Sequence, residues 1–250
     1  MTRPSSTTDA PGTLHVVAVP IGHMDDLTIR ARDILRTVDL IATEDPEATH
    51  ALLAHHGIRR QDLGSVTSYH HANRDEKTAT LCRRLQDGQS VALVVDTGTP
   101  AVYDPGAFLV RAARRLAIRI DAIPGPSALT AALSVSGLDT DRTIHLGRLP
   151  HRKAAAKALL RPLARLPYAL VVFLDPRRLE AELGILADCL GDREACLCWN
   201  LTGPGEQLTV SPLSTLREID EDRQDAAQAT IVIASKTTAR TRPRRRSRRT

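Results

Sequence analysis

Aromatic side chains and long apolar segments are both scarce in this sequence. Phe, Trp and Tyr make up 2% of its 250 residues, and no apolar run approaches the roughly 20 residues of a membrane-spanning helix. Residues 1–12 are rich in Ser, Thr and Pro and contain no apolar stretch of the kind found in secretory signals. The sequence therefore predicts a cytoplasmic protein with a flexible leader over residues 1–12.

Cysteine is also rare. The chain contains four cysteines, Cys82, Cys189, Cys196 and Cys198, which in a chain of this length indicate reduced thiols rather than a disulfide framework. Cys196 and Cys198 alternate along one expected strand, so we expect both to be packed against a core or a helix.

Several signatures of common enzyme classes are missing. There is no Gly-x-Gly-x-x-Gly after the first expected strand, no Walker-type Gly-Lys, no His-Glu-x-x-His and no Gly-x-Ser-x-Gly. These absences argue against ordinary dinucleotide enzymes, nucleoside triphosphatases, zinc proteases and serine hydrolases. The paired histidines His70 and His71 do not indicate a metal site, because adjacent side chains diverge and no other ligand lies nearby at a suitable spacing.

Positive charge is concentrated at the C-terminal end. The formal net charge is +5, but residues 240–249 carry seven of the 34 Lys and Arg and none of the 29 Asp and Glu. The rest of the chain is therefore close to neutral. The Arg-rich tail, residues 236–250, lacks apolar periodicity and is expected to be disordered until it meets a partner, for which nucleic acid is favoured over a purely solvated role.

Strand and helix patterns alternate five times in the first half of the chain. Short apolar runs such as Leu14–Val19, Leu40–Ala42 and Val91–Val95 are each followed by a segment with helical spacing. This alternation predicts a parallel sheet with helices on both faces, forming an N-terminal α/β domain over residues 13–146.

The second half predicts a smaller mixed α/β domain over residues 147–235. The segment Gly147–Lys153 is interpreted as a linker that becomes a basic helix. Strands are expected at Ala169–Leu174, Cys196–Asn200, Gln207–Val210 and Thr230–Ala234, with a helix over Arg177–Leu190.

Three loops at the expected strand ends are rich in small residues and lack cations. They read Pro20-Ile21-Gly22-His23, Asp96-Thr97-Gly98-Thr99-Pro100 and Pro124-Gly125-Pro126-Ser127-Ala128. Ligands of open α/β sheets bind at the carboxyl ends of the strands, and phosphate groups there usually need cations or a helix N-terminus. The loops therefore favour a neutral or positively charged ligand.

These loops are part of a longer ordered series of motifs: VAVPIGHMDDLT, LIATED, SYHHAN, VALVVDTGTPAVYDPG, IPGPSALTAALSVSGLDTDR and GRLPHRK. Together they resemble the tetrapyrrole methylase superfamily and, within it, the family that methylates a cytidine ribose 2′-hydroxyl of small-subunit ribosomal RNA. The resemblance runs from about residue 12 to residue 234. It implies two α/β domains, S-adenosylmethionine in the cleft between them, and a homodimer.

The resemblance also implies a cofactor site. Carried over by position, its residues are Pro20, Ile21, Gly22, Gly98, Thr99, Pro100, Val102, Ser127 and Ala128. In the second domain the family segment Arg-Glu-Leu-Thr-Lys is reduced to Leu201 and Thr202. The first domain, which carries the implied cofactor residues, thus matches the family more closely than the second domain, which is expected to contribute to the substrate site.

Transfer of a methyl group to a ribose hydroxyl requires alignment of the reacting atoms and a base, but no metal. Asp45 and His70 are the predicted catalytic bases, with Glu44 and Asp104 in reserve. The alternative for Asp45 is that it caps the helix that begins at Pro46. The leading hypothesis is RNA methylation, in which the scarcity of aromatics favours phosphate contacts over base stacking. Methylation of a small molecule such as a tetrapyrrole, and binding of the cofactor or RNA without turnover, are the alternatives.

Overall fold

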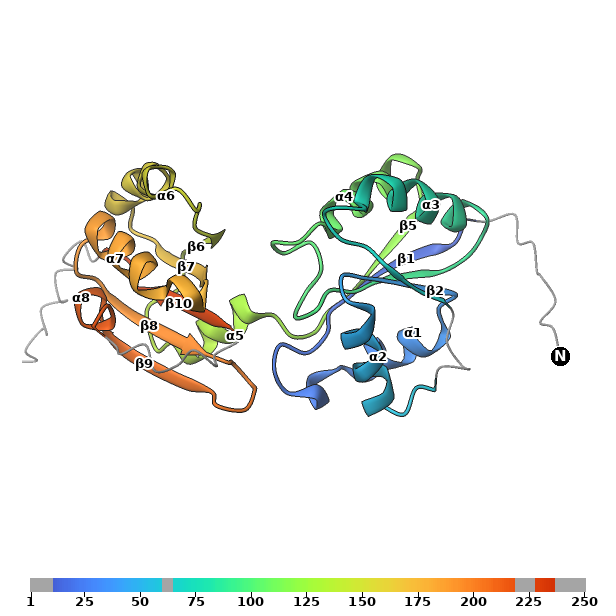
Figure 1. Ribbon diagram of the computed structural model, residues 1–250, viewed down its shortest axis with the longest axis horizontal. Helices are drawn as coiled ribbons and strands as arrows, with labels where there is room; N and C mark the ends of the chain where they lie inside the picture. Colours follow the sequence, from blue (N-terminus) through green and yellow to red (C-terminus); the bar gives the residue numbers. More distant parts are fainter. Residues whose placement is uncertain (1–10, 60–64, 219–227, 237–250) are drawn as a thin grey trace, which may run out of the picture. The chain divides into compact units, whose positions relative to one another are not determined.

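Two compact units make up the chain in the computed structural model, which describes residues 11–59, 65–218 and 228–236 (Figure 1). The first unit contains the chain up to Ala131 together with Leu201–Glu206, and the second contains the remainder. The predicted Arg-rich tail lies outside the described residues, except for its first residue, as does the predicted leader, except for its last two residues.

The first unit is built on a five-stranded sheet in the order β3-β2-β4-β1-β5, and every neighbouring pair of strands is parallel. The strands are β1 (Thr13–Val17), β2 (Leu40–Thr43), β3 (Ser65–Ser68), β4 (Val91–Leu93) and β5 (Arg119–Ile123). The predicted parallel sheet is confirmed. β1 and β4 each end two residues earlier than predicted, because their apolar runs continue into the loops that follow, whereas β2 extends one residue beyond its predicted end.

Helices cover both faces of this sheet. On one face α1 (Ile29–Thr37) and α2 (Pro46–His55) bury Leu35 and Leu52 against Ile41. On the other face α3 (Arg74–Gln86) and α4 (Gly106–Arg115) bury Leu81 and Leu109 against Leu93. Each such leucine contributes about 1.5–3 kcal/mol relative to an exposed position, so the two apolar layers hold the strand ends at a fixed edge.

Side-chain caps determine where the helices on the first face begin. The hydroxyl of Thr28 accepts the N–H of Ala31 at 3.1 Å, which starts α1. The carboxylate of Asp45 accepts the N–H groups of Glu47 and Ala48 at 2.8 and 3.2 Å, and Pro46 occupies the first helical position. The predicted cap at Asp45 is thereby confirmed.

The second unit contains a mixed sheet in the order β6-β7-β10-β8-β9. Only β6 and β7 are parallel among its described strands, and the other pairs are antiparallel. The strands are β6 (Thr143–Arg148), β7 (Ala169–Leu174), β8 (Glu194–Trp199), β9 (Gln207–Pro212) and β10 (Ala229–Ile233). Its helices are α6 (Lys153–Leu160), α7 (Leu179–Leu190) and α8 (Leu213–Leu216), with 3₁₀ turns η3 (Arg161–Arg165) and η4 (Pro176–Arg178). The turn η1 (Met24–Asp26) belongs to the first unit, and α5 (Ala128–Val135) begins in the first unit and ends in the second.

The division of the chain differs from the predicted boundary after residue 146. β6 crosses that boundary and pairs with β7, and its side chains Ile144 and Leu146 pack against the apolar core of the second unit. The predicted linker Gly147–Lys153 therefore begins inside a strand. The register shift between His145 and Arg148 explains why the sequence shows no clean strand alternation there.

Cys196 and Cys198 lie on β8 with their Sγ atoms 3.7 Å apart, and they are 0% and 1% exposed. Neither of them forms a disulfide within the described residues. The prediction that they are packed rather than paired in a disulfide is confirmed.

Candidate functional site

The three predicted loops meet at the carboxyl edge of the first sheet. The N–H of Val19, after β1, donates to the carbonyl of Gly98 at 2.9 Å, and the N–H of Gly98 donates back to Val19 at 3.2 Å. From the same loop, the hydroxyl of Thr99 donates to the carbonyl of Pro126 at 2.9 Å. Hydrogen bonds thus join the loops after β1, β4 and β5 into one rim.

The loop after β4 holds an unusual backbone shape. Gly98 has a φ of 84°, and the non-glycine residues Ala101 and Tyr103 have φ values of 67° and 70°. A side chain in this left-handed region costs roughly 1–2 kcal/mol. The carboxylate of Asp104 closes the loop by accepting the N–H of Gly106 at 2.7 Å. Strain of this kind is typical of loops that shape a binding site.

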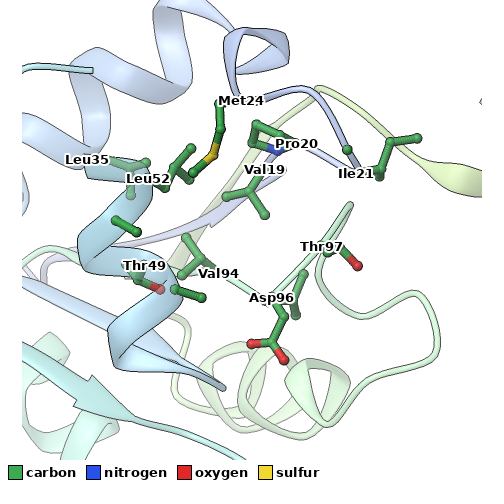
Figure 2. A pocket seen from close by; sticks show the side chains of 14 residues that line it. Val19, Pro20, Ile21, Met24, Leu35, Thr49, Leu52, Val94, Asp96 and Thr97 are labelled. Atoms are coloured by element: carbon green, nitrogen blue, oxygen red, sulfur yellow. The ribbon is translucent and has the colours of Figure 1, made fainter. Parts of the chain in front are cut away.

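A cavity of about 200 Å³ lies beside this rim. Figure 2 shows Leu35, Leu52 and Met24 at its apolar end, with Asp96 and Thr97 on the loop that follows β4 at its polar end. The lining residues come from the loops after β1 and β4 and from helices α1 and α2: Val19, Pro20, Ile21, Gly22, Met24, Leu35, Ala48, Thr49, Ala51, Leu52, Val94, Val95, Asp96 and Thr97.

The predicted cofactor residues divide between this cavity and the rim. Pro20, Ile21 and Gly22 line the cavity. Gly98 and Thr99 are hydrogen-bonded to the loops on either side, whereas Pro100, Val102, Ser127 and Ala128 lie on the rim segments outside the cavity lining. The lining residues Met24, Thr49 and Asp96 were not predicted. Of these, Asp96 could have been found, because it opens the same loop motif as Gly98.

A distant segment packs against the loop after β1. Leu201 is buried, and the Thr202 hydroxyl accepts the N–H of His23 at 3.1 Å. A Cβ built on Gly22 would lie 2.5 Å from both the nitrogen of Gly203 and the carbonyl oxygen of Leu201. Leu201 and Thr202, the two residues matched to the family segment, are therefore among those that contact this loop.

Four carboxylates gather where β2 and β4 end. Glu44 and Asp45 follow β2, while Asp96 and Asp104 follow β4, the strand next to it. Burial raises the pKa of Glu44 to about 7, and the nearby charges of Asp96 and Asp104 add to this effect. Burial and the charge of Asp45 also raise the pKa of Asp96. Among the described residues, no hydrogen-bond partner reaches the buried Oδ2 atom of Asp104.

The two predicted bases are already engaged in local contacts. The Asp45 side chain caps α2, as described above. The backbone N–H of His70 donates to Oδ1 of Asn73 at 2.9 Å, and its ring nitrogen Nε2 lies 3.2 Å from the Asn73 amide nitrogen. His70 follows β3, which neighbours β2, so both residues lie at the same edge of the sheet. Their catalytic role stays a prediction.

The charge of the site indicates which ligand fits it. Among the described residues, no Lys or Arg lines the cavity, and a half-buried carboxylate with a pKa near 7 lies beside its polar end. A positively charged group placed here would relieve the repulsion between the carboxylates. A sulfonium fits this environment, whereas a phosphate does not.

Comparison with known proteins places the chain in one family of methylases. The family model for Tetrapyrrole (Corrin/Porphyrin) Methylases matches residues 13–217. Ribosomal RNA small subunit methyltransferase I of Xylella fastidiosa (strain Temecula1) is 42% identical over 89% of this chain and 81% of the relative. The protein of the same name from Escherichia coli O157:H7 is 36% identical over 94% of this chain and 82% of the relative.

Solved structures share the same fold. The methyltransferase CobJ superposes with a TM-score of 0.68 at 20% identity, covering 93% of this chain and 98% of that chain. Uroporphyrin-III C-methyltransferase from Thermus thermophilus, solved with S-adenosyl homocysteine, gives a TM-score of 0.61 at 20% identity and covers 89% of this chain and 97% of that chain. In the part of the chain that the structure describes, no helix is both long and apolar enough to span a membrane.

Proposed function

Because this chain belongs to the tetrapyrrole methylase family, we propose that it is an S-adenosylmethionine-dependent methyltransferase that methylates the 2′-hydroxyl of a cytidine ribose in small-subunit ribosomal RNA. Relatives named for methylation of this RNA are 36–42% identical to it over most of its length. The observation that carries the proposal is a rim of three small-residue loops without Lys or Arg, next to four carboxylates that follow β2 and β4.

When bound, S-adenosylmethionine supplies a methyl group on a positively charged sulfur, already activated for transfer. This chain has to hold the acceptor oxygen in line with that methyl group and to remove the hydroxyl proton. The loops joined at Val19, Gly98 and Pro126 form a rigid edge for positioning. The apolar lining of the cavity excludes water from that edge.

Glu44 is the group best suited to accept the proton. Its pKa of about 7 matches the pH of a cell, where a carboxyl group of ordinary pKa would be a weaker base. Asp45, next to it, holds the start of α2, and Asp96 and Asp104 keep Glu44 basic through their charge. We also propose that the protein acts in the cytoplasm and as a homodimer.

The proposal is tested by incubating the full chain with tritiated S-adenosylmethionine and unmodified small-subunit ribosomal RNA. We expect label in the RNA at one cytidine, with the adjoining phosphodiester resistant to alkali, because a methylated 2′-oxygen cannot attack it. Glu44→Gln is expected to lower kcat by about 100-fold or more. Asp45→Asn, which preserves the helix cap, is expected to lower kcat much less.

Calorimetric titration with S-adenosylmethionine tests the cofactor site separately. Ser127→Trp places a large ring on the rim beside Pro126 and is expected to abolish binding, whereas Arg115→Trp on the exposed end of α4 is expected to preserve it. If the folded parent fails to bind S-adenosylmethionine, the proposal of a methyltransferase is wrong. Binding without label in any RNA would instead contradict the proposed substrate.

A further inference from the structure

Two loops of the second unit carry a concentration of cationic side chains. They follow β6 and β7, which are parallel neighbours, so both loops lie at the same edge of the second sheet. The first loop continues from the end of β6 through residue 153, and the second spans residues 175–178. Their cationic residues are Arg148, Arg152, Lys153, Arg177 and Arg178, with His151 among them.

A buried carboxylate ties these loops together. Glu182 on α7 is 2% exposed; it accepts the N–H of Asp175 at 3.1 Å and pairs with Arg178 at 3.3 Å. The guanidinium of Arg178 also donates to Nδ1 of His151 at 2.9 Å and to the His151 carbonyl at 3.2 Å. Arg178 therefore fixes the loop after β6 to the loop after β7.

The anchoring contacts leave an excess of positive charge on the surface. Glu182 is buried beneath Arg178, and the carboxylate of Asp175 accepts the N–H of Arg177 at 3.0 Å within η4. The side chains of Arg148, Arg152, Lys153 and Arg177 are all exposed. The carboxylates of Asp175 and of Glu180, an exposed residue in the first turn of α7, offset two of these four cations, so an excess of positive charge remains.

We propose that these two loops bind the ribose-phosphate backbone of the RNA that the enzyme methylates, an inference that rests on the proposed function. The loops present several exposed cations to a polyanion, and phosphate contacts supply much of the affinity of proteins for nucleic acids. With aromatic residues at 2% of the chain, stacking on bases has little to contribute. Arg178 acts as a positioning residue, since its guanidinium is occupied by Glu182 and His151.

The test uses the full chain and a fluorescent transcript of small-subunit ribosomal RNA, with affinity measured over a range of salt concentrations. The double variant Arg152→Glu/Arg177→Glu is expected to bind at least about tenfold more weakly. The slope of log affinity against log salt should become shallower by about 1.4, since each phosphate contact on a single strand accounts for ~0.7. S-adenosylhomocysteine binding, measured by calorimetry, is expected to stay unchanged.

The matched control is Arg111→Glu/Arg114→Glu, which makes the same charge change on the exposed face of α4 in the first unit. It is expected to weaken binding less than about twofold at moderate salt, because it makes the same change of charge without altering either of the two loops. Equal losses in the two double variants, or no loss in either, would overturn the inference while leaving the proposed function intact. A parent that binds S-adenosylmethionine but neither binds nor labels the RNA would contradict the proposed substrate itself.

Discussion

Glu44 illustrates how burial at a single position links stability to function. Burial raises its folded pKa to about 7, above the usual glutamate value of 4.5. Between these two pH values the folded chain holds more protons than the unfolded chain, so the free energy of unfolding falls as the pH rises from 4.5 to 7. The protein is therefore less stable at neutral pH because it keeps a basic carboxylate buried at the site.

Glu44→Gln is therefore expected to stabilise the protein in a pH-dependent way. The free energy of unfolding of the variant minus that of the parent should grow by roughly 2 kcal/mol between pH 5 and pH 8. This value is smaller than the full pKa shift would give, to allow for solvent screening. Urea denaturation at both pH values measures the difference. Glu47→Gln, three residues along and exposed, is the control and should show little change with pH. A parent and a Glu44 variant with parallel pH profiles would show that Glu44 titrates normally.

The sequence alone could not rank Glu44 above Asp45. Both follow the same strand, and their local patterns differ only in the cap that Asp45 provides. The pKa of Glu44 is raised first by its burial in the fold and then by the charges of Asp96 and Asp104, which follow the neighbouring strand β4. Side-chain chemistry of this kind becomes visible only when distant residues are placed in space.

Among the structural elements, the tight contact at Gly22 makes the strongest prediction. Gly22→Ala would put a methyl carbon against the backbone of Leu201 and Gly203, and backbone atoms cannot turn aside as a flexible side chain can. We expect the free energy of unfolding to fall by about 3 kcal/mol, in the range of overpacked interiors. Binding of S-adenosylmethionine should weaken too, because Gly22 lines the cavity. Thermal unfolding and calorimetry measure the two effects.

Gly184→Ala also replaces a glycine by alanine, but we expect it to raise the free energy of unfolding rather than lower it. Gly184 lies inside α7, and a Cβ there would meet the Arg217 side chain at 3.6 Å, an ordinary contact. Alanine favours a helix interior by about 0.8–1 kcal/mol over glycine, so this variant should be more stable than the parent. Equal effects of the two substitutions would contradict the proposed collision at Gly22.

Elements with clear periodicity could be predicted, and those with mixed patterns could not. β7 has the predicted bounds, because a continuous apolar run marks it in the sequence. β6 was missed, since Gly147 and Pro150 indicate a loop while its strand character depends on pairing with β7. The contact between Leu201–Glu206 and the loop after β1 has no local signal in the sequence.

At the scale of the whole molecule, charge is divided between the described units and the Arg-rich tail. Deleting residues 238–250 removes seven arginines and is expected to weaken RNA binding and flatten its salt dependence, because clustered arginines displace counterions from phosphates. Binding titrations of the full and truncated chains at several salt concentrations measure the slope. S-adenosylmethionine affinity serves as the control and should be equal in both. An unchanged slope would remove the tail from RNA binding.

The path of the chain also constrains how this protein can evolve. Leu201–Glu206 belongs to the first unit, although the residues on both sides of it belong to the second. A single genetic crossover that replaced everything after residue 131 would combine the Gly22 loop of one parent with the 201–206 segment of another. Where the backbone contact is as close as at Gly22, most such chimaeras would fit poorly. We therefore expect the two segments to have been inherited together and to change in a correlated way among descendants.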